Sequence, residues 1–113
     1  VASTDATFGM PEVRVGIPSV IEAALLPSLI GIGRTKQLVL TGESISAPEA
    51  ARWGLVDRVV TRRELAEATH SWASSIGAAG SHAIRLQKAL LRHWEDLPLN
   101  RAVEEGVLSF CRA

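Results

Sequence analysis

A short segment near the start of the chain, Phe8–Gly9–Met10–Pro11–Glu12–Val13, narrows the ways in which the first third can fold. Pro11 has a fixed φ and no backbone donor, and its ring pushes the preceding residue toward extended geometry. Gly9 and Gly16, on either side, mark bends or close approaches of the backbone. We therefore expect Glu12 to lie on a stiff, extended-to-turn segment rather than on a mobile loop.

Glu12 is a charged residue among apolar neighbours, and two interpretations follow from that environment. Burial of a carboxyl group favours its proton-carrying form, which is how a general acid that works near neutral pH arises. The other interpretation is an ordinary glutamate at the end of a strand, which is the more common case because most carboxylates are solvated. The residues alone leave both interpretations open.

The pattern along the rest of the chain predicts a mixed first part and a helical second part. Ser46 and Thr61 each stand three residues before a glutamate, which is the spacing of a capping box at a helix start. Apolar periodicity and the Gly and Pro positions predict the remaining elements. In chain order we expect an extended segment over 6–15, a helix over 20–26 capped by Ser19, a helix over 34–40, a helix from Pro48 to Gly54, a strand over 55–60, a helix over 65–76, a helix from Ser81 to the Leu97–Pro98 break, and a last helix after that break.

Composition argues against several kinds of partner and chemistry. The 12 lysine and arginine residues balance the 12 aspartate and glutamate residues, so no net positive charge predicts binding to nucleic acid or to an anionic membrane surface. No apolar stretch is long enough to predict a membrane span. The three histidines have no cysteine partners at zinc-ligand spacing, so no metal site is predicted. The single cysteine cannot form an internal disulfide and fits a reducing compartment, the cytoplasm.

Five motifs follow one another along the chain. They are Phe-Gly-x-Pro-Glu-Val at 8–13, Gly-Ile-Pro at 16–18, Leu-Ile-Gly at 29–31, Leu-Thr-Gly-Glu-x-Ile-Ser-Ala-x-Glu-Ala at 40–50 and Trp-Gly-Leu-Val-Asp-Arg-Val-Val at 53–60. In this order they resemble the second half of the enoyl-CoA hydratase/isomerase, or crotonase, family. The resemblance covers nearly the whole chain, and the ordered set is much more specific than any single motif.

The resemblance implies an α/β crotonase-like fold, a ββα superhelix, of which this chain would be a fragment. The fragment would have a mainly helical C-terminal half and a few short strands near its N-terminal end. Residues 1–60 would be the C-terminal portion of the crotonase core, with the Pro–Glu active-site segment. Residues 61–113 would be a helical oligomerisation region that builds a homotrimer or a dimer of trimers.

The activity that the resemblance implies is the hydration of 2-enoyl-CoA thioesters through an enolate that two backbone amides stabilise. In the hydratases of this family the glutamate of the Pro–Glu step is one of two catalytic glutamates, and Glu12 occupies that position. Pro18, Ser19 and Glu22 are the implied substrate-binding residues. No metal or redox cofactor is implied, because CoA is part of the substrate.

Part of this segment departs from the family pattern and leaves alternatives open. Small residues that make room for the acyl group usually follow the Gly-Ile-Pro motif, whereas this chain has Ser19-Val20-Ile21-Glu22. Glu22, the only charged residue from 17 to 32, either lies at the mouth of a cleft or points to solvent. The alternative activities are an enoyl-CoA isomerase or a CoA-thioester hydrolase on the same fold. A non-catalytic helical assembly module is the alternative outside the enzymes.

We predict that residues 1–113 by themselves do not turn over enoyl-CoA. The family's glycine-rich turn, with its first glutamate and oxyanion-hole amides, has no counterpart in this sequence, which resembles the C-terminal part of a longer protein. Loss of one oxyanion donor typically costs roughly 100- to 1000-fold in rate, and both donors should be missing. The measurement is a hydration assay on purified residues 1–113 without a complementing fragment, and measurable turnover would contradict the prediction.

Overall fold

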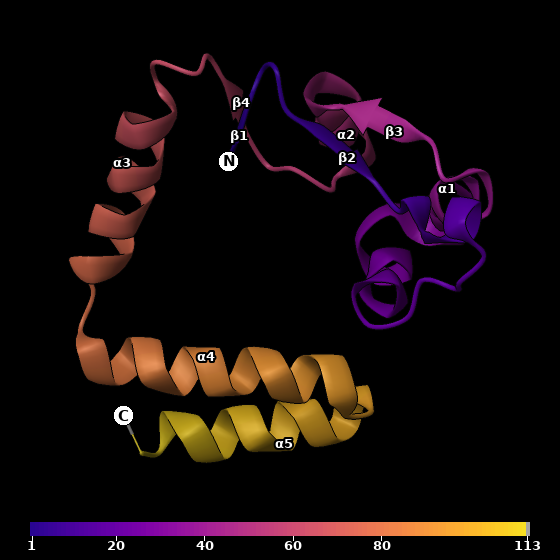
Figure 1. Ribbon diagram of the computed structural model, residues 1–113. Helices are drawn as coiled ribbons and strands as arrows, with labels where there is room; N and C mark the ends of the chain where they lie inside the picture. The colour runs from indigo at the N-terminus through magenta and orange to yellow at the C-terminus, as the bar shows by residue number, and fades with distance from the viewer. Residues whose placement is uncertain (113) are drawn as a thin grey trace. The chain divides into compact units, whose positions relative to one another are not determined.

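The computed structural model describes residues 1–112. The chain forms two compact units, which divide after Thr69, within helix α3 (Leu65–Gly77). Unit 1 holds every strand of the described residues together with the first helices, and unit 2 is helical (Figure 1). Each unit has its own packing and is described by itself.

Unit 1 contains two small sheets of two strands each. The strands are β1 (Ala2–Ser3), β2 (Thr7–Gly9), β3 (Ser44–Ser46) and β4 (Val59–Val60). β1 pairs with β4 in parallel, with Ala2 opposite Val59, and β2 pairs with β3 in antiparallel fashion, with Phe8 opposite Ile45. The start of the chain is thereby held by segments that follow much later in the sequence (Figure 1).

The helices confirm most of the elements that the sequence predicts. They are the 3-10 helices η1 (Pro11–Val15) and η2 (Glu22–Leu25) and the α-helices α1 (Leu26–Thr41), α2 (Ala47–Trp53), α3, α4 (Ser81–Asp96) and α5 (Leu99–Phe110). α2 and α3 begin next to the two predicted capping boxes. The break at Leu97 and Pro98 separates α4 from α5, as expected. No helix within residues 1–112 is both long and apolar enough to span a membrane.

The extended segment predicted over 6–15 is wrong in its second half. The strand ends at Gly9, and Pro11 then begins the 3-10 helix η1. Proline is well suited to a first helical turn, because its φ is already helical and its missing N–H is not needed there. Glu12 therefore lies in the first turn of a short helix rather than on an extended strand.

The helix predicted over 20–26 is also placed differently. Between Gly16 and α1 only 22–25 is helical, as a short 3-10 helix, and α1 itself begins at Leu26 with Pro27 in its first turn. Ser19 caps neither helix, because the residues at the cap positions are Ile21 and Leu25, and its hydroxyl donates to the Glu12 carboxylate. α1 has one non-helical residue, Gly31, so it consists of two helical segments that join at a kink.

The strand predicted over 55–60 shrinks to its last two residues. The backbone N–H of Gly54 donates to the Ala51 carbonyl, and that of Leu55 donates to the Ala50 carbonyl. These two bonds form a Schellman motif at the end of α2. Because Leu55 completes the end of a helix, its N–H is not available to a strand.

The core of unit 1 forms where α1 and α2 pack together over the strands. Its most buried members come from the two helices, with Ala47 and Ala50 of α2 fully buried and Leu38 of α1 only 2% exposed. The buried residues of this cluster are Ala2, Ala23, Leu26, Ile30, Leu38, Ile45, Ala47, Ala50, Trp53 and Val56. Burial of such side chains stabilises a fold by roughly 1.5–3 kcal/mol for each large one.

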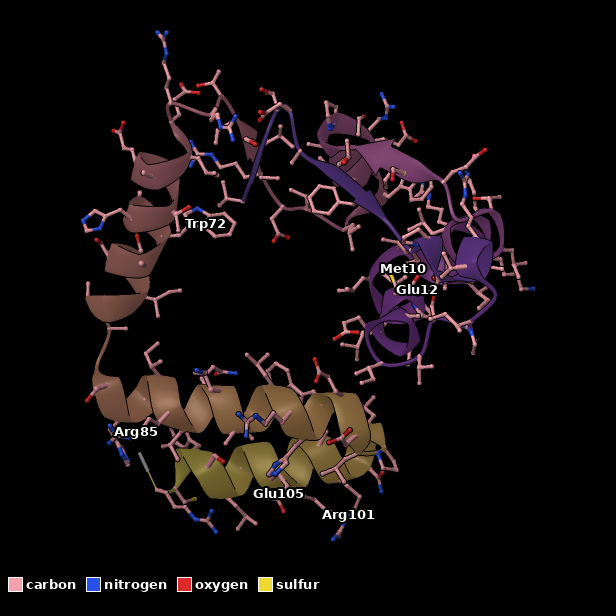
Figure 2. All side chains as sticks on the ribbon, in the orientation of Figure 1. Met10, Glu12, Trp72, Arg85, Arg101 and Glu105 are labelled. Atoms are coloured by element: carbon pink, nitrogen blue, oxygen red, sulfur yellow. The ribbon has the colours of Figure 1, made fainter. Side chains whose placement is uncertain are left out.

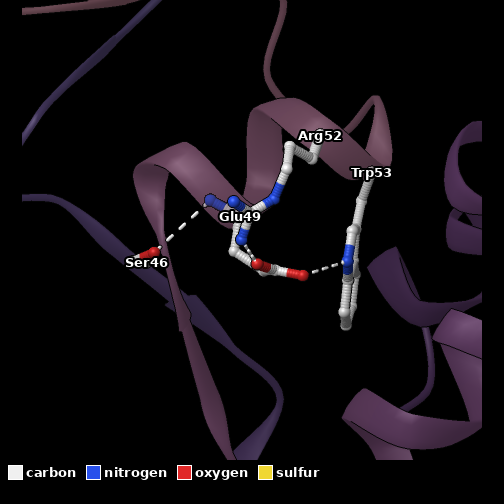
Figure 3. Close-up of polar contacts among 4 residues, drawn as sticks. All are labelled: Ser46, Glu49, Arg52 and Trp53. Carbon is white, nitrogen blue, oxygen red and sulfur yellow. Dashed lines mark hydrogen bonds and ion pairs between the residues drawn. The ribbon is translucent and has the colours of Figure 1, made fainter.

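Trp53 joins α2 to α1 by polar as well as apolar contacts. Its indole N–H donates to the Glu49 carboxylate at 2.6 Å, and the same carboxylate pairs with Arg52 (Figure 3). From α1, the Arg34 guanidinium lies 5.5 Å from the centre of the Trp53 ring and donates to the Trp53 carbonyl. A cation over an indole ring is a favourable contact, so Trp53 is held from both helices.

Each of the two capping boxes forms only one of its two characteristic side-chain-to-backbone hydrogen bonds, and it is a different one at each helix. At α2 the Ser46 hydroxyl accepts from the Glu49 backbone N–H, whereas the Glu49 side chain turns to other partners (Figure 3). Before α3, the Glu64 carboxylate accepts from both the hydroxyl and the backbone N–H of Thr61. These two hydrogen bonds lower the pKa of Glu64, and the bond from the hydroxyl has the larger effect.

Unit 2 contains α4 and α5, which lie side by side (Figure 1). Leu90, Ala102 and Ser109 are buried between them. The other apolar residues of this helix pair are more exposed, with Leu99 at 81% and Phe110 at 84%. The pair therefore buries a narrow seam and leaves much of its apolar surface uncovered within the described residues.

The short helix η1 is held against the C-terminal end of α1. The Arg14 Nε donates to the Thr41 carbonyl at 3.2 Å, at a helix end where a cation is favourable. The aliphatic part of Arg14 covers Gly42, which ends α1 with φ of 64°. Only glycine adopts this left-handed conformation without strain, and it also leaves room for the arginine.

We predict that Gly42→Ala destabilises the protein by at least about 1–2 kcal/mol, the cost of a left-handed conformation for a residue with a Cβ. The added Cβ would also lie 2.9 Å from the Cγ of Arg14. Urea denaturation measures the change. Gly33→Ala is the matched control, because Gly33 lies in α1 with open space where its added methyl group would lie, and the substitution should be neutral or stabilising. Equal stabilities of the two variants would contradict the prediction.

Candidate active site

The segment from Glu12 to Ser19 folds back on itself. The backbone N–H groups of Gly16 and Ile17 donate to the carbonyls of Val13 and Glu12, at 3.3 and 3.2 Å. Gly16 adopts φ of 82°, a left-handed conformation that reverses the chain after η1. The turn returns Ser19 to the start of η1.

The reversal brings together Glu12, predicted as a catalytic residue, and Ser19, predicted as a substrate-binding residue. The Ser19 hydroxyl donates to the Oε2 of Glu12 at 2.7 Å, and the pair is partly buried. Glu12 forms no ion pair within residues 1–112, and Arg14, two residues away, is directed to Thr41. Figure 2 shows Glu12 and Met10 close together at the start of η1. The carboxylate is therefore bound by a neutral donor rather than by a cation.

A cavity of about 440 Å³ lies next to this pair, and its size is that of a small-molecule site. Ser19 and Thr35 supply its only polar side chains, and the Thr35 hydroxyl is already bonded to the Gly31 carbonyl. The cavity is lined by Val13, Pro18, Ser19, Val20, Ala23, Ala24, Thr35, Val39 and Leu40. The site is thus an apolar pocket whose lining residue Ser19 is hydrogen-bonded to the Glu12 carboxylate, which does not itself line the cavity.

The predicted site residues fall into two groups. Glu12, Pro18 and Ser19 come together, since Pro18 and Ser19 line the cavity and Ser19 holds Glu12. Glu22 begins η2 with an exposed side chain and does not line the cavity. Its role in substrate choice stays a prediction.

The α1 side of the cavity is formed by residues that were not predicted as site residues. Thr35 and Val39 stand one turn apart on α1, so the same helix face carries both into the lining. The i, i+4 spacing is a signal that they share a face. Nothing in that spacing says that the face turns toward Pro18 and Ser19.

A second cavity, of about 670 Å³, lies on unit 2 and has a different character. Apolar residues of α4, α5 and their connection line it: Trp94, Leu97, Leu99, Ala102, Val103, Gly106, Val107 and Phe110. It contains no group that titrates and none of the predicted site residues. Although it is the larger cavity, it offers an apolar contact surface and no proton-transfer chemistry.

No three His, Cys, Asp or Glu side chains of residues 1–112 are grouped so that they could bind a metal ion. The three histidines all lie in α3 and α4, beyond the residues of the cavity. Among the described residues no titratable side chain lines the cavity, and the Glu12 carboxyl is joined to it by the hydrogen bond from Ser19, which does line it.

A family profile and individual relatives of this chain point to the same family. The profile of the family described as enoyl-CoA hydratase/isomerase matches residues 1–110. A crotonyl-CoA hydratase of Syntrophomonas wolfei is 38% identical over 100% of this chain and 45% of its own length. A carnitinyl-CoA dehydratase of Salmonella typhimurium is 34% identical over 96% of this chain and 43% of its own length. The chain thus spans less than half the length of these relatives.

Solved structures resemble the fold of this chain closely. An enoyl-CoA hydratase of Bacillus anthracis matches with a TM-score of 0.91 at 32% identity, over 96% of this chain and 42% of that one. A probable enoyl-CoA hydratase/isomerase of Mycobacterium abscessus matches with a TM-score of 0.94 at 30% identity, over 98% and 44%. The fold of the described residues is therefore that of the corresponding part of these enzymes.

Proposed function

We propose, since the chain belongs to the enoyl-CoA hydratase/isomerase family, that the protein hydrates 2-enoyl-CoA thioesters. The observation that carries the proposal is the Glu12 carboxyl, held by Ser19 at the edge of an apolar cavity. A carboxyl group in that position can deliver a proton to carbon in a substrate whose acyl part occupies the cavity. Relatives named for crotonyl-CoA hydration and carnitinyl-CoA dehydration support the same chemistry.

The proposed reaction adds water across a carbon–carbon double bond. Oxygen from water bonds to the β-carbon, and the electron pair of the double bond moves to the thioester carbonyl, which gives an enolate. Collapse of the enolate takes a proton onto the α-carbon from Glu12, and the proton lost by water restores the Glu12 carboxyl. Backbone amides and a second base, from family segments that have no counterpart in this chain, complete the proposed site.

The cavity favours an apolar acyl group. Its lining is almost wholly apolar, and Pro18 and Ser19 belong to it. Burial of acyl methylene groups there would contribute about 0.8 kcal/mol each to binding. We assign Glu22 to substrate choice outside the cavity, since its exposed side chain would meet only the parts of a substrate that extend beyond the lining.

Glu12→Gln should lower kcat by roughly 100- to 10,000-fold, because glutamine keeps the shape of the side chain but cannot exchange a proton. Affinity for the CoA thioester should change little, since the variant removes no apolar contact of the cavity. Glu12→Asp should recover little activity, because its carboxylate is withdrawn by one methylene group. Single-turnover kinetics and equilibrium binding on the full-length protein measure both quantities.

Glu67→Gln is the matched control for these variants, because Glu67 is exposed on α3 and does not line the cavity. Its activity should equal that of the parent. Turnover by Glu12→Gln within about threefold of the parent would show that Glu12 is not the proton carrier. Product analysis with 2-enoyl and 3-enoyl thioesters separates hydration from double-bond isomerisation and from thioester hydrolysis.

Unit 2 is proposed to mediate self-association into a homotrimer or a dimer of trimers. Support comes from the second cavity and from the exposed apolar side chains around it, such as Val107 at 60%. Large uncovered apolar surfaces of this kind mark interaction sites, and closed symmetric assemblies are the common outcome.

Val107→Glu should therefore shift the full-length protein to smaller species in sedimentation velocity, because it places a charge on the apolar surface. Asn100→Glu is the control, since this exposed residue of α5 lies outside the cavity lining and the same charge is introduced. A parent protein that sediments as a monomer at micromolar concentration would contradict the proposal. An unchanged assembly in Val107→Glu would exclude this surface as the contact.

A further inference from the structure

The hydrogen bond between Ser19 and Glu12 is well formed. The Ser19 Oγ and the Glu12 Oε2 are 2.7 Å apart and partly buried. This is the usual distance of a well-formed O–H···O hydrogen bond. It is the only hydrogen bond that the structure records for the Glu12 carboxylate within residues 1–112.

Packing alone does little to orient the Glu12 side chain. None of the five residues of η1 is buried, and Val13 and Val15, on either side of Arg14, are exposed. Glutamate is among the side chains that lose the most rotamer freedom when they are fixed. A carboxylate on such a helix needs a specific partner to hold one orientation.

Ser19 is well placed to be that partner, because its own position is restrained. The turn at Gly16 carries two backbone hydrogen bonds, and Pro18 directly precedes the serine. Proline restricts the backbone on both sides of the X–Pro bond, which lowers the entropy cost of fixing the turn. The Ser19 hydroxyl that donates to the Glu12 Oε2 therefore belongs to a stiff segment. The other carboxyl oxygen, Oε1, stays available for proton transfer.

We propose that Ser19 is a positioning residue, which orients the Glu12 carboxyl toward the reacting carbon and acts on the reaction only through Glu12. This inference rests on the proposed function of Glu12 as the proton carrier. It differs from a substrate-binding role for Ser19, although the residue also lines the cavity. A substrate contact would contribute to affinity with or without Glu12, whereas a positioning contact loses its effect when Glu12 cannot transfer a proton.

Ser19→Ala, Glu12→Gln and the double variant of the full-length protein separate these roles. Ser19→Ala should lower kcat by roughly 10- to 100-fold, because the proton carrier loses the contact that orients it, with KM within about threefold of the parent. In the Glu12→Gln background the same substitution should have no further effect on the single-turnover rate. Ser19→Thr keeps the hydroxyl and should restore activity to within about threefold of the parent.

Ser28→Ala is the matched control, because Ser28 is an exposed serine of α1 whose hydroxyl donates to the Leu25 carbonyl and does not reach Glu12. It should retain the kinetics of the parent. Thermal denaturation of every variant checks that a lost rate is not lost folding. A kcat of Ser19→Ala within threefold of the parent would overturn the proposal. Equal losses in both backgrounds, or no recovery in Ser19→Thr, would also overturn it.

A spectroscopic measurement without substrate separates failure of this inference from failure of the proposed function. The carboxyl carbon resonance of Glu12, assigned by its loss in Glu12→Gln, should move in Ser19→Ala and stay in place in Ser28→Ala. An unmoved resonance would show that Ser19 does not bind the carboxylate, whatever the protein catalyses. The resonance could move in Ser19→Ala while the parent neither hydrates 2-enoyl-CoA nor exchanges the α-proton of a saturated acyl-CoA with deuterium oxide. That result would confirm the hydrogen bond but overturn the catalytic assignment of both residues.

Discussion

The contact between Arg14 and the C-terminal end of α1 holds the element on which the candidate site depends. A 3-10 helix of five residues with no buried member has little stability of its own, because a single turn fixes many dihedral angles for few hydrogen bonds. Arg14 supplies the missing restraint, since its Nε donates to the Thr41 carbonyl and its stem covers Gly42. The orientation of Glu12 is thus tied to where α1 ends.

The position of α1 depends in turn on the core of unit 1. Leu26, Ile30 and Leu38 are buried on either side of the kink at Gly31, so both helical segments are held by the same cluster. Trp53 links that cluster to α2 through its ring, its indole N–H and its carbonyl. The same helix that packs the core with one face lines the candidate cavity with Thr35 and Val39. A change in the core would therefore be transmitted to the cavity by the helix that belongs to both.

The two cavities, one on each unit, differ in the chemical groups that line them. The cavity of unit 1 has a carboxyl group at its edge and a hydroxyl that holds it, whereas the cavity of unit 2 is lined by apolar groups alone. Burial of apolar area is the main source of association energy between proteins, but it has no means to move a proton. These linings therefore support the proposals that proton transfer takes place in unit 1 and that self-association takes place through unit 2.

Local signals in the sequence were sufficient for the start of α2, the end of α4 and the family. The capping spacings at Ser46 and Thr61 and the break at Pro98 predict helix ends, because each acts on backbone groups only a few residues away. The ordered motifs also single out Glu12. The sequence did not reveal that Ser19 serves Glu12 instead of capping a helix, that Leu55 closes α2 instead of joining a strand, or that Val39 faces the cavity. The tertiary structure decides these three points through the chain reversal at Gly16, the end of α2 and the packing of α1. In each case the local sequence allows more than one hydrogen-bond partner or more than one helix face, and only the packed structure selects one of them.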